Sequence, residues 1–306
     1  MASGSAAGDA NIKVAVVGVK GSPASLHALS WAAHASGEGM TLHAVHAVSP
    51  AIELAVAVAQ VDSRNLVDER RRQLEREWIV PIRDRSLTLE THVVEDDPAP
   101  AVLRVADEVS ADLVVVGAHG RWQHGPRRIG PTIVQLIDTT STTLVIVPEG
   151  GDELASGPVV VGVGPSDSDA EPGTLAPSLR WAAGFAKAHD LALGLVRAGG
   201  HPPLFSVEGF ISKIAQLLEP GVLRSWALED LSELADRIRS TTDADLRVSV
   251  SAHGRSVGPR LVEASADAAL LVLDARPKAR APVPSWMHHA IGHVRCPVVL
   301  VPPVGG

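Results

Sequence analysis

The sequence is poor in cysteine and in aromatic residues. Its 306 residues include one Cys, no Tyr and only 3% aromatic residues. A single Cys excludes an intrachain disulfide and a metal site built from several thiolates. An apolar run follows Cys296, so we expect a buried, unreactive thiol. With so few rings, the core must consist of Val, Leu, Ile and Ala, and platforms on which nucleic-acid bases stack are not expected.

The chain also lacks a basic excess and a long apolar segment. Its 27 Lys and Arg residues face 35 Asp and Glu residues, a net charge of -8, whereas nucleic-acid-binding domains usually carry a basic footprint. No apolar run approaches the roughly 20 residues that span a bilayer. Residues 1–11 lack the basic and apolar regions of a signal peptide and predict a disordered tail. We therefore expect a cytoplasmic protein that binds neither nucleic acid nor membrane.

Four segments of the first half recur in the second half in the same order, which indicates a duplication. The matched pairs are Val14–Val19 and Val159–Val163, Leu29–Ala33 and Leu179–Ala183, Ala111–Val116 and Ala268–Leu273, and Thr143–Pro148 and Pro297–Pro302. The polar, Gly-rich stretch between the halves predicts a junction. We expect two domains, residues 12–150 and 157–303.

Within each half, apolar β-rich runs alternate with helical patterns, which predicts an α/β fold with a parallel sheet. The first half predicts strands near 12–19, 41–48, 87–94, 112–117 and 143–147, and helices near 23–36, 62–80, 98–109 and 131–140. Each half is therefore expected to form an open, doubly wound, five-stranded parallel sheet. Ligands of such sheets bind beyond the carboxyl ends of the strands, where Gly18–Gly21, His46 and Gly117–Gly120 fall.

The loop after the fourth strand carries the strongest functional signal. An apolar run ends in Gly117-Ala-His-Gly120, and a helical segment opens at Gly130-Pro131-Thr132. Glycines and a helix N-terminus let backbone N–H groups approach an anion closely. The loop is basic, and no acid lies between Asp112 and Asp138. This pattern indicates a phosphate group as ligand.

With this spacing, each half resembles a universal stress protein domain, and the chain resembles a tandem member of that family. The family loop has Gly, two residues, Gly, nine residues and Gly, matched here by Gly117, Gly120 and Gly130; His293–Val301 resembles the closing segment. The resemblance covers nearly all of residues 12–303. It implies a Rossmann-like, adenine-nucleotide-binding fold and a stress-response regulator.

The resemblance further implies that the first half binds ATP or another adenine nucleotide, with Mg²⁺ only as a companion of ATP. Gly117 and Gly120 would allow close backbone approach, Gly130 and Thr132 would contact phosphate, and Val45 or its neighbours would line the adenine pocket. The full set of expected binding residues is Val19, Lys20, Val45, Gly117, His119, Gly120, Arg127, Gly130, Pro131 and Thr132.

Two positions depart from the family pattern. Lys20 stands where the family commonly has Asp, so an adenosine contact is lost or the position is redirected toward phosphate. Pro131 replaces the usual Ser or Thr and has no N–H to donate. In the second half, Asp274 and Pro277 replace the first two glycines of the loop. We expect residues 151–306 to bind no nucleotide.

Other groups of potential ligand residues give weaker functional signals. His289 and His293 form an i,i+4 pair that could meet a metal, but no carboxylate or thiol stands at an adjacent ligand spacing. His43 and His46 should point to opposite faces of a strand. We expect no metal site. Trp122 could cover a nucleotide, face a partner or be simply exposed.

No catalytic constellation stands out, so we expect no enzyme and at most slow ATP hydrolysis. Three functions stay open: a nucleotide-binding regulator, a nucleotide-free scaffold that acts through protein partners, and an enzyme that uses the nucleotide site. In the resembled family the fifth strands commonly pair across a dimer. Here Thr143–Val147 and Pro297–Val301 are expected to pair within the chain, which leaves open whether the protein also forms a homodimer.

Overall fold

The computed structural model describes residues 12–35, 39–49, 63–82, 87–118, 129–150, 155–164, 175–198, 220–253, 256–275 and 283–303. Valine-rich runs form its strands, because branched side chains suit a sheet covered on both faces. The first five strands are β1 (Val14–Gly18), β2 (Thr41–Val48), β3 (Thr88–Glu95), β4 (Leu113–Gly117) and β5 (Thr143–Val147). The next five are β6 (Val159–Gly162), β7 (Leu193–Ala198), β8 (Val248–His253), β9 (Leu270–Asp274) and β10 (Val298–Val301).

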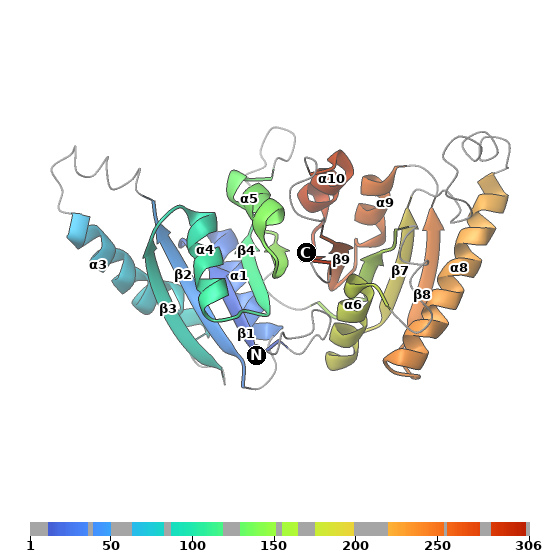
Figure 1. Cartoon of the computed structure of the whole chain (residues 1–306), viewed down its shortest axis with the longest axis horizontal. Helices are drawn as coiled ribbons and strands as arrows, with labels where there is room; N and C mark the ends of the chain where they lie inside the picture. The colour runs from blue at the N-terminus through green and yellow to red at the C-terminus, as the bar shows by residue number, and fades with distance from the viewer. Residues whose placement is uncertain are drawn as a thin grey trace.

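All ten strands form one sheet that runs across the molecule from β3 to β8 (Figure 1). Their order is β3-β2-β1-β4-β5-β10-β9-β6-β7-β8. The two sets of five strands thus follow the same order, read outward from the middle of the sheet. Pairing is parallel within each set, as expected from the alternation of strands and helices.

The two sets meet at β5 and β10, which pair antiparallel. Val145 lies opposite Val299, and Leu144 lies opposite Leu300. All four side chains are buried. The fifth strand of each set is therefore an interior strand of the continuous sheet.

Helices cover both faces of the sheet and create two apolar cores. One core lies under α1 (Pro23–His34), η1 (Leu74–Trp78), α6 (Pro177–Ala188) and α8 (Pro220–Thr241). The other lies under α4 (Pro98–Glu108), α5 (Pro131–Thr139), α9 (Val257–Ala264) and α10 (Ser285–His293). Trp31 and Trp181 are buried in the first core. No helix in the described ranges is long and apolar enough to cross a membrane.

The helix predicted over 62–80 is not one regular helix. It consists of α3 (Ser63–Gln73), the π-helical turn η1 and the 3-10 turn η2 (Val80–Ile82). Pro81 explains why no α-helix continues through residue 81, because proline cannot donate an intrahelical hydrogen bond and its ring clashes with the preceding turn. In the π-helical turn before it, the N–H of Ile79 donates to the Leu74 carbonyl, at 3.2 Å.

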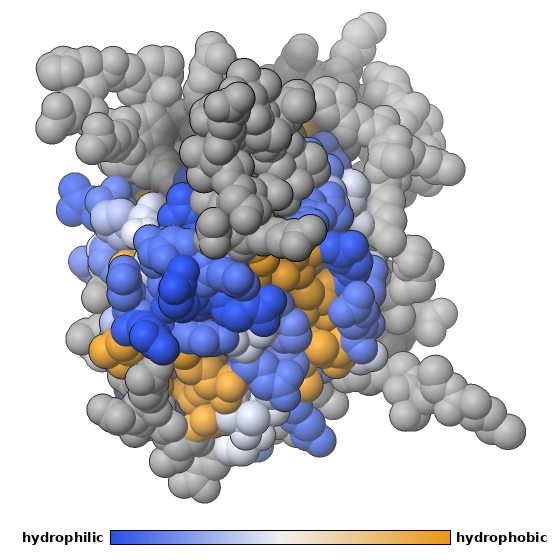
Figure 2. All heavy atoms as spheres, turned by 90° about the vertical axis from the view of Figure 1, so that its left-hand side faces the viewer, coloured by the Kyte–Doolittle hydropathy of each residue, from blue (hydrophilic) through white to orange (hydrophobic). Residues whose placement is uncertain are grey.

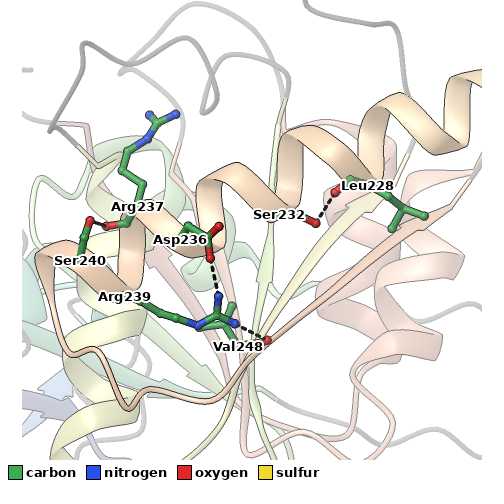
Figure 3. A network of polar contacts seen from close by, with 7 residues as sticks. All are labelled: Leu228, Ser232, Asp236, Arg237, Arg239, Ser240 and Val248. Carbon is green, nitrogen blue, oxygen red and sulfur yellow. Dashed lines mark hydrogen bonds and ion pairs between the residues drawn. The ribbon is translucent and has the colours of Figure 1, made fainter.

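Polar contacts tie α8 to the outer strand β8 (Figure 3). The Arg239 guanidinium donates to Asp236, one turn earlier in α8, at 2.7 Å, and to the Val248 carbonyl at 3.2 Å. Ser232 and Ser240 donate to carbonyls of their own helix. Because the Val248 contact joins a helix to the strand that it covers, it helps to fix α8 against the far end of the sheet.

Candidate functional site

A cavity of about 390 Å³ lies at the carboxyl ends of β1, β2 and β4. Its volume is in the range of small-molecule sites. The wall is mostly apolar and includes Val45, Val102, Val116 and Ile133. Lys20, Ser25, His46 and Thr132 add polar groups. The cavity thus combines an apolar pocket with a few polar groups, the usual composition of a small-molecule site.

Hydrogen bonds hold the loop between β1 and α1 against this cavity. The Val19 N–H donates to the Val45 carbonyl at 2.8 Å, and His46 Nδ1 lies 2.8 Å from the Val19 carbonyl. The Lys20 N–H donates to Ser25 Oγ at 3.2 Å. The Lys20 side chain itself is exposed at the rim, where partial desolvation by the surrounding protein lowers its pKa.

His46 is a buried neutral group of the site. Burial lowers its pKa, the Val19 carbonyl opposes this effect and Arg70 adds to it. Because a carbonyl only accepts, Nδ1 carries the hydrogen and Nε2 is left with a lone pair. The ring packs edge-on against Trp78, with the ring centroids 5.0 Å apart. Trp78 also backs Gly21, whose φ of 74° favours glycine.

The N-terminus of α5 opens toward the cavity. Gly130 precedes the helix with φ -65° and ψ 154°, and no side chain in the described part of the chain caps the first turn. The first N–H groups of a helix have no intrahelical acceptor and carry a partial positive charge. Pro131 supplies no N–H, so Thr132 and Ile133 provide the donors here. A Cβ placed on Gly130 would meet no atom of the described residues within 4 Å.

Gly117 has a different reason for being glycine. A Cβ at this position would lie 2.1 Å from the Ala24 carbonyl oxygen. The missing side chain therefore allows α1 to pack on the end of β4. Gly117 also lines the cavity, and the close backbone approach to a ligand that the resemblance implies for it stays a prediction.

A sequence model of the universal stress protein family matches residues 11–148. Residues 11–148 are a universal stress protein domain. Universal stress protein Rv1996 of Mycobacterium tuberculosis is 34% identical over 140 residues, which make up 43% of this chain and 42% of that protein. A universal stress protein of Mycobacterium bovis matches to the same extent. The chain thus spans less than half the length of these curated relatives.

Solved structures show the same fold over both sets of strands. A universal stress protein from Archaeoglobus fulgidus superposes with a TM-score of 0.66 at 11% identity, and the match covers 95% of this chain and 98% of that one. A putative universal stress protein from Pseudomonas aeruginosa gives a TM-score of 0.55 at 14% identity, covering 96% and 94%. At these identities the likeness concerns the fold alone.

The universal stress protein domain brings most of the predicted binding residues together. Those that line the cavity are Val19, Lys20, Val45, Gly117, Gly130, Pro131 and Thr132. His119, Gly120 and Arg127 lie outside the described residues, as do Trp122 and Pro277. Sequence reasoning missed the wall residues Ser25, Ala47, Pro98, Val102, Val116 and Ile133. Parallel topology could have suggested Val116, the residue before Gly117, whereas the helix residues depend on packing.

The corresponding positions in the second set of strands differ. Asp274 ends β9 opposite Val301, as Gly117 ends β4 opposite Val147. Burial raises the pKa of the Asp274 carboxyl, and contacts with Ser178 partly offset the increase. Pro284 precedes α10 with φ -60° and ψ 145°, close to the backbone of Gly130. A residue with a side chain therefore fits this backbone conformation. At Gly130 the lack of a side chain leaves space at the start of α5.

The other predicted candidates have structural explanations. Cys296 is buried, as predicted, and burial raises the pKa of its thiol to about 12. His289 and His293 stack with ring centroids 4.1 Å apart, and no third metal-ligating side chain joins them among the described residues. His43, however, lies beside Glu90 and His92. The sequence does not predict this cluster, because only the register of β2 and β3 brings Glu90 and His92 beside His43.

Proposed function

We propose that the universal stress protein domain, residues 12–150, binds ATP or another adenine nucleotide in the cavity beside Gly130. The observation that carries this proposal is the pairing of an apolar wall with an uncapped helix end. The wall around Val45 and Val102 suits a flat base, and the first turn of α5 offers N–H donors to phosphate. Lys20 at the rim adds a cation.

In this proposal the nucleotide acts as a regulatory ligand that stabilises one conformation. Mg²⁺ would enter only with ATP. The described lining contains no carboxylate, and His46 is held by the Val19 carbonyl. We therefore propose at most slow hydrolysis and no dedicated enzymatic reaction.

We also propose that residues 157–303 form a second, degenerate domain of the same family that binds no nucleotide. The half-buried Asp274 carboxyl stands where Gly117 stands in the first domain, and a carboxylate repels phosphate. Pro284 occupies the position of Gly130. We propose that the two domains pair within one chain through β5 and β10.

The first experiment identifies what the purified full-length protein carries, by denaturation, chromatography and mass spectrometry, followed by calorimetric titration with ATP. Gly130→Val fills space that the described residues leave open and causes no backbone strain, so it should retain the melting temperature and weaken ATP binding by at least about a hundredfold, or about 2.7 kcal/mol. Lys20→Met should weaken binding by about tenfold.

Lys13→Met is the matched control, because Lys13 is also exposed but precedes β1 at the opposite end of the strand. It should bind like the wild type. A protein that is empty and takes up no ATP, or a Gly130→Val variant with unchanged affinity, contradicts the proposal. The nucleotide-free scaffold would then be the better account.

A further inference from the structure

Three potential metal ligands converge on the outer part of the sheet. His43 Nδ1 lies 3.0 Å from His92 Nε2 and 3.4 Å from the nearer carboxylate oxygen of Glu90. All three ligand atoms lie within 4.8 Å of one another. We propose that His43, Glu90 and His92 form a binding site for a divalent transition-metal ion of the zinc type.

The spacing suits such an ion. Bonds of about 2.0–2.2 Å to a tetrahedral Zn²⁺ place neighbouring ligand atoms about 3.3–3.5 Å apart. The contact between His43 and Glu90 already has this length, and the contact between the two imidazoles needs to lengthen by a few tenths of an ångström. Two His and one Glu are a known zinc ligand set that leaves a fourth position to water.

Rigid elements supply the ligands. Glu90 of β3 lies directly opposite His43 of β2, and His92 is two residues further along β3. Because side chains alternate along a strand, Glu90 and His92 share the face on which His43 lies. The site therefore requires no loop to fold over the ion.

A hydrogen bond between the two imidazoles explains only part of this arrangement. A ring nitrogen carries either one hydrogen or one lone pair, so His43 Nδ1 can make one good hydrogen bond. Both the His92 imidazole and the Glu90 carboxylate nevertheless approach that nitrogen. A cation would use the imidazole nitrogens and the carboxylate together, and Glu90 would neutralise part of its charge.

The burial pattern allows an ion to enter. His43 is buried, His92 is half-buried, and the Glu90 side chain is 54% exposed. His92 also lines an open groove at the β3 edge, to which Arg104 and Glu108 contribute from α4. The face that shows this end of the molecule carries broad hydrophilic areas beside separate apolar patches (Figure 2). A hydrated cation thus has a polar approach to the cluster.

The cluster is specific to the first set of strands. Val16, His43 and Glu90 lie side by side across β1, β2 and β3, and the corresponding row across β6, β7 and β8 is Val160, Gly194 and Ser249. Ser251 stands two residues beyond Ser249, as His92 stands beyond Glu90. The second set therefore offers no imidazole or carboxylate in this row.

None of the three ligands belongs to the described lining of the nucleotide cavity. The test therefore does not depend on ATP binding. The full chain, without a histidine tag and treated with a chelator, is titrated with Co²⁺ and read by the visible absorption of a tetrahedral complex. Zn²⁺ should displace the Co²⁺ and raise the melting temperature by binding the folded state.

Glu90→Gln keeps the shape of a largely exposed side chain and should weaken Zn²⁺ binding by at least about tenfold, while His92→Gln should abolish the Co²⁺ spectrum. The doubly substituted control with His289→Gln and His293→Gln should retain it. A wild-type protein without a Co²⁺ spectrum overturns the proposal. Metal binding that persists in both the Glu90→Gln and the His92→Gln variants would also overturn the proposal. Loss of binding in the control with His289→Gln and His293→Gln would do the same.

Discussion

Val145 of β5 lies directly opposite Val299 of β10, and the two valines hold corresponding positions in their strands. Val145 lies two residues before Val147, which faces Gly117 at the end of β4. Val299 likewise lies two residues before Val301, which faces Asp274 at the end of β9. Equivalent residues that face each other are the mark of a two-fold, self-complementary interface. The approximate two-fold axis of the sheet therefore passes between Val145 and Val299.

This relationship predicts a cross-link within one chain. Directly opposed residues of antiparallel strands have Cα atoms about 4.5–5.5 Å apart, within the range of disulfides. In a Cys296→Ala background, Val145→Cys combined with Val299→Cys should oxidise to a disulfide without forming a covalent dimer. Mass spectrometry and non-reducing electrophoresis read the result. A covalent dimer from Val145→Cys alone would show that β5 pairs between chains and would refute the intrachain arrangement.

Gly117 and Gly130 should respond oppositely to a methyl group. Gly117→Ala forces a Cβ against the Ala24 carbonyl and should destabilise the protein by about 3 kcal/mol. Gly130→Ala enters open space and should change the free energy of unfolding by less than about 0.5 kcal/mol. Urea denaturation measures both values. Equal costs at the two positions would contradict the packing role assigned to Gly117.

The ion pair between Arg197 of β7 and Asp230 of α8 should matter for stability. The Arg197 side chain is only 4% exposed and that of Asp230 is 23% exposed. Removing one partner of a buried pair leaves a charge desolvated. Because Asp230 keeps some contact with solvent, Asp230→Asn should cost about 2–4 kcal/mol.

The matched control is Glu263→Gln, which breaks a pair with Arg260 whose side chains are 46% and 65% exposed. Such a pair contributes less than about 1 kcal/mol. Urea denaturation of both variants compares the two costs directly. A cost for Asp230→Asn no larger than that of this control would show that the buried pair contributes little.

Protonation of His46 should lower stability in mild acid. Burial lowers the pKa of His46 in the folded state below the value of about 6.5 that it has when unfolded. The unfolded state therefore binds more protons as the pH falls from about 6.5 toward the folded-state pKa, and stability declines through that window. Above the window the contribution is fully present.

His46→Gln should reduce the difference in unfolding free energy between neutral and mildly acidic solution. Urea denaturation at both pH values, for wild type and variant, gives this difference. The pKa values of His43 and His189 are also lowered by burial, so a residual pH dependence should persist. An identical pH dependence in the two proteins would rule out His46 as a contributor.

The sequence by itself determined the alternation of strands and helices, because apolar runs and helical spacing are local patterns. The strand predicted at 41–48 is observed as Thr41–Val48, and the helix predicted near 98–109 is observed as Pro98–Glu108. It also placed Lys20, His46 and Gly117 at one edge, since parallel strands present their carboxyl ends together. The local rule that proline ends a helix predicted an end at Pro81, but it did not predict the π-helical turn that precedes Pro81.

Only the tertiary structure decided which distant residues meet. Strand register placed His92 beside His43, across 49 positions of the sequence. Helix packing brought Ala24 against Gly117 and Asp230 against Arg197. Periodicity tells which face of an element is apolar, but the register of strands and the seating of helices arise from the packing of the whole molecule. The cavity wall, the metal-ligand cluster and the buried ion pair all depend on that packing.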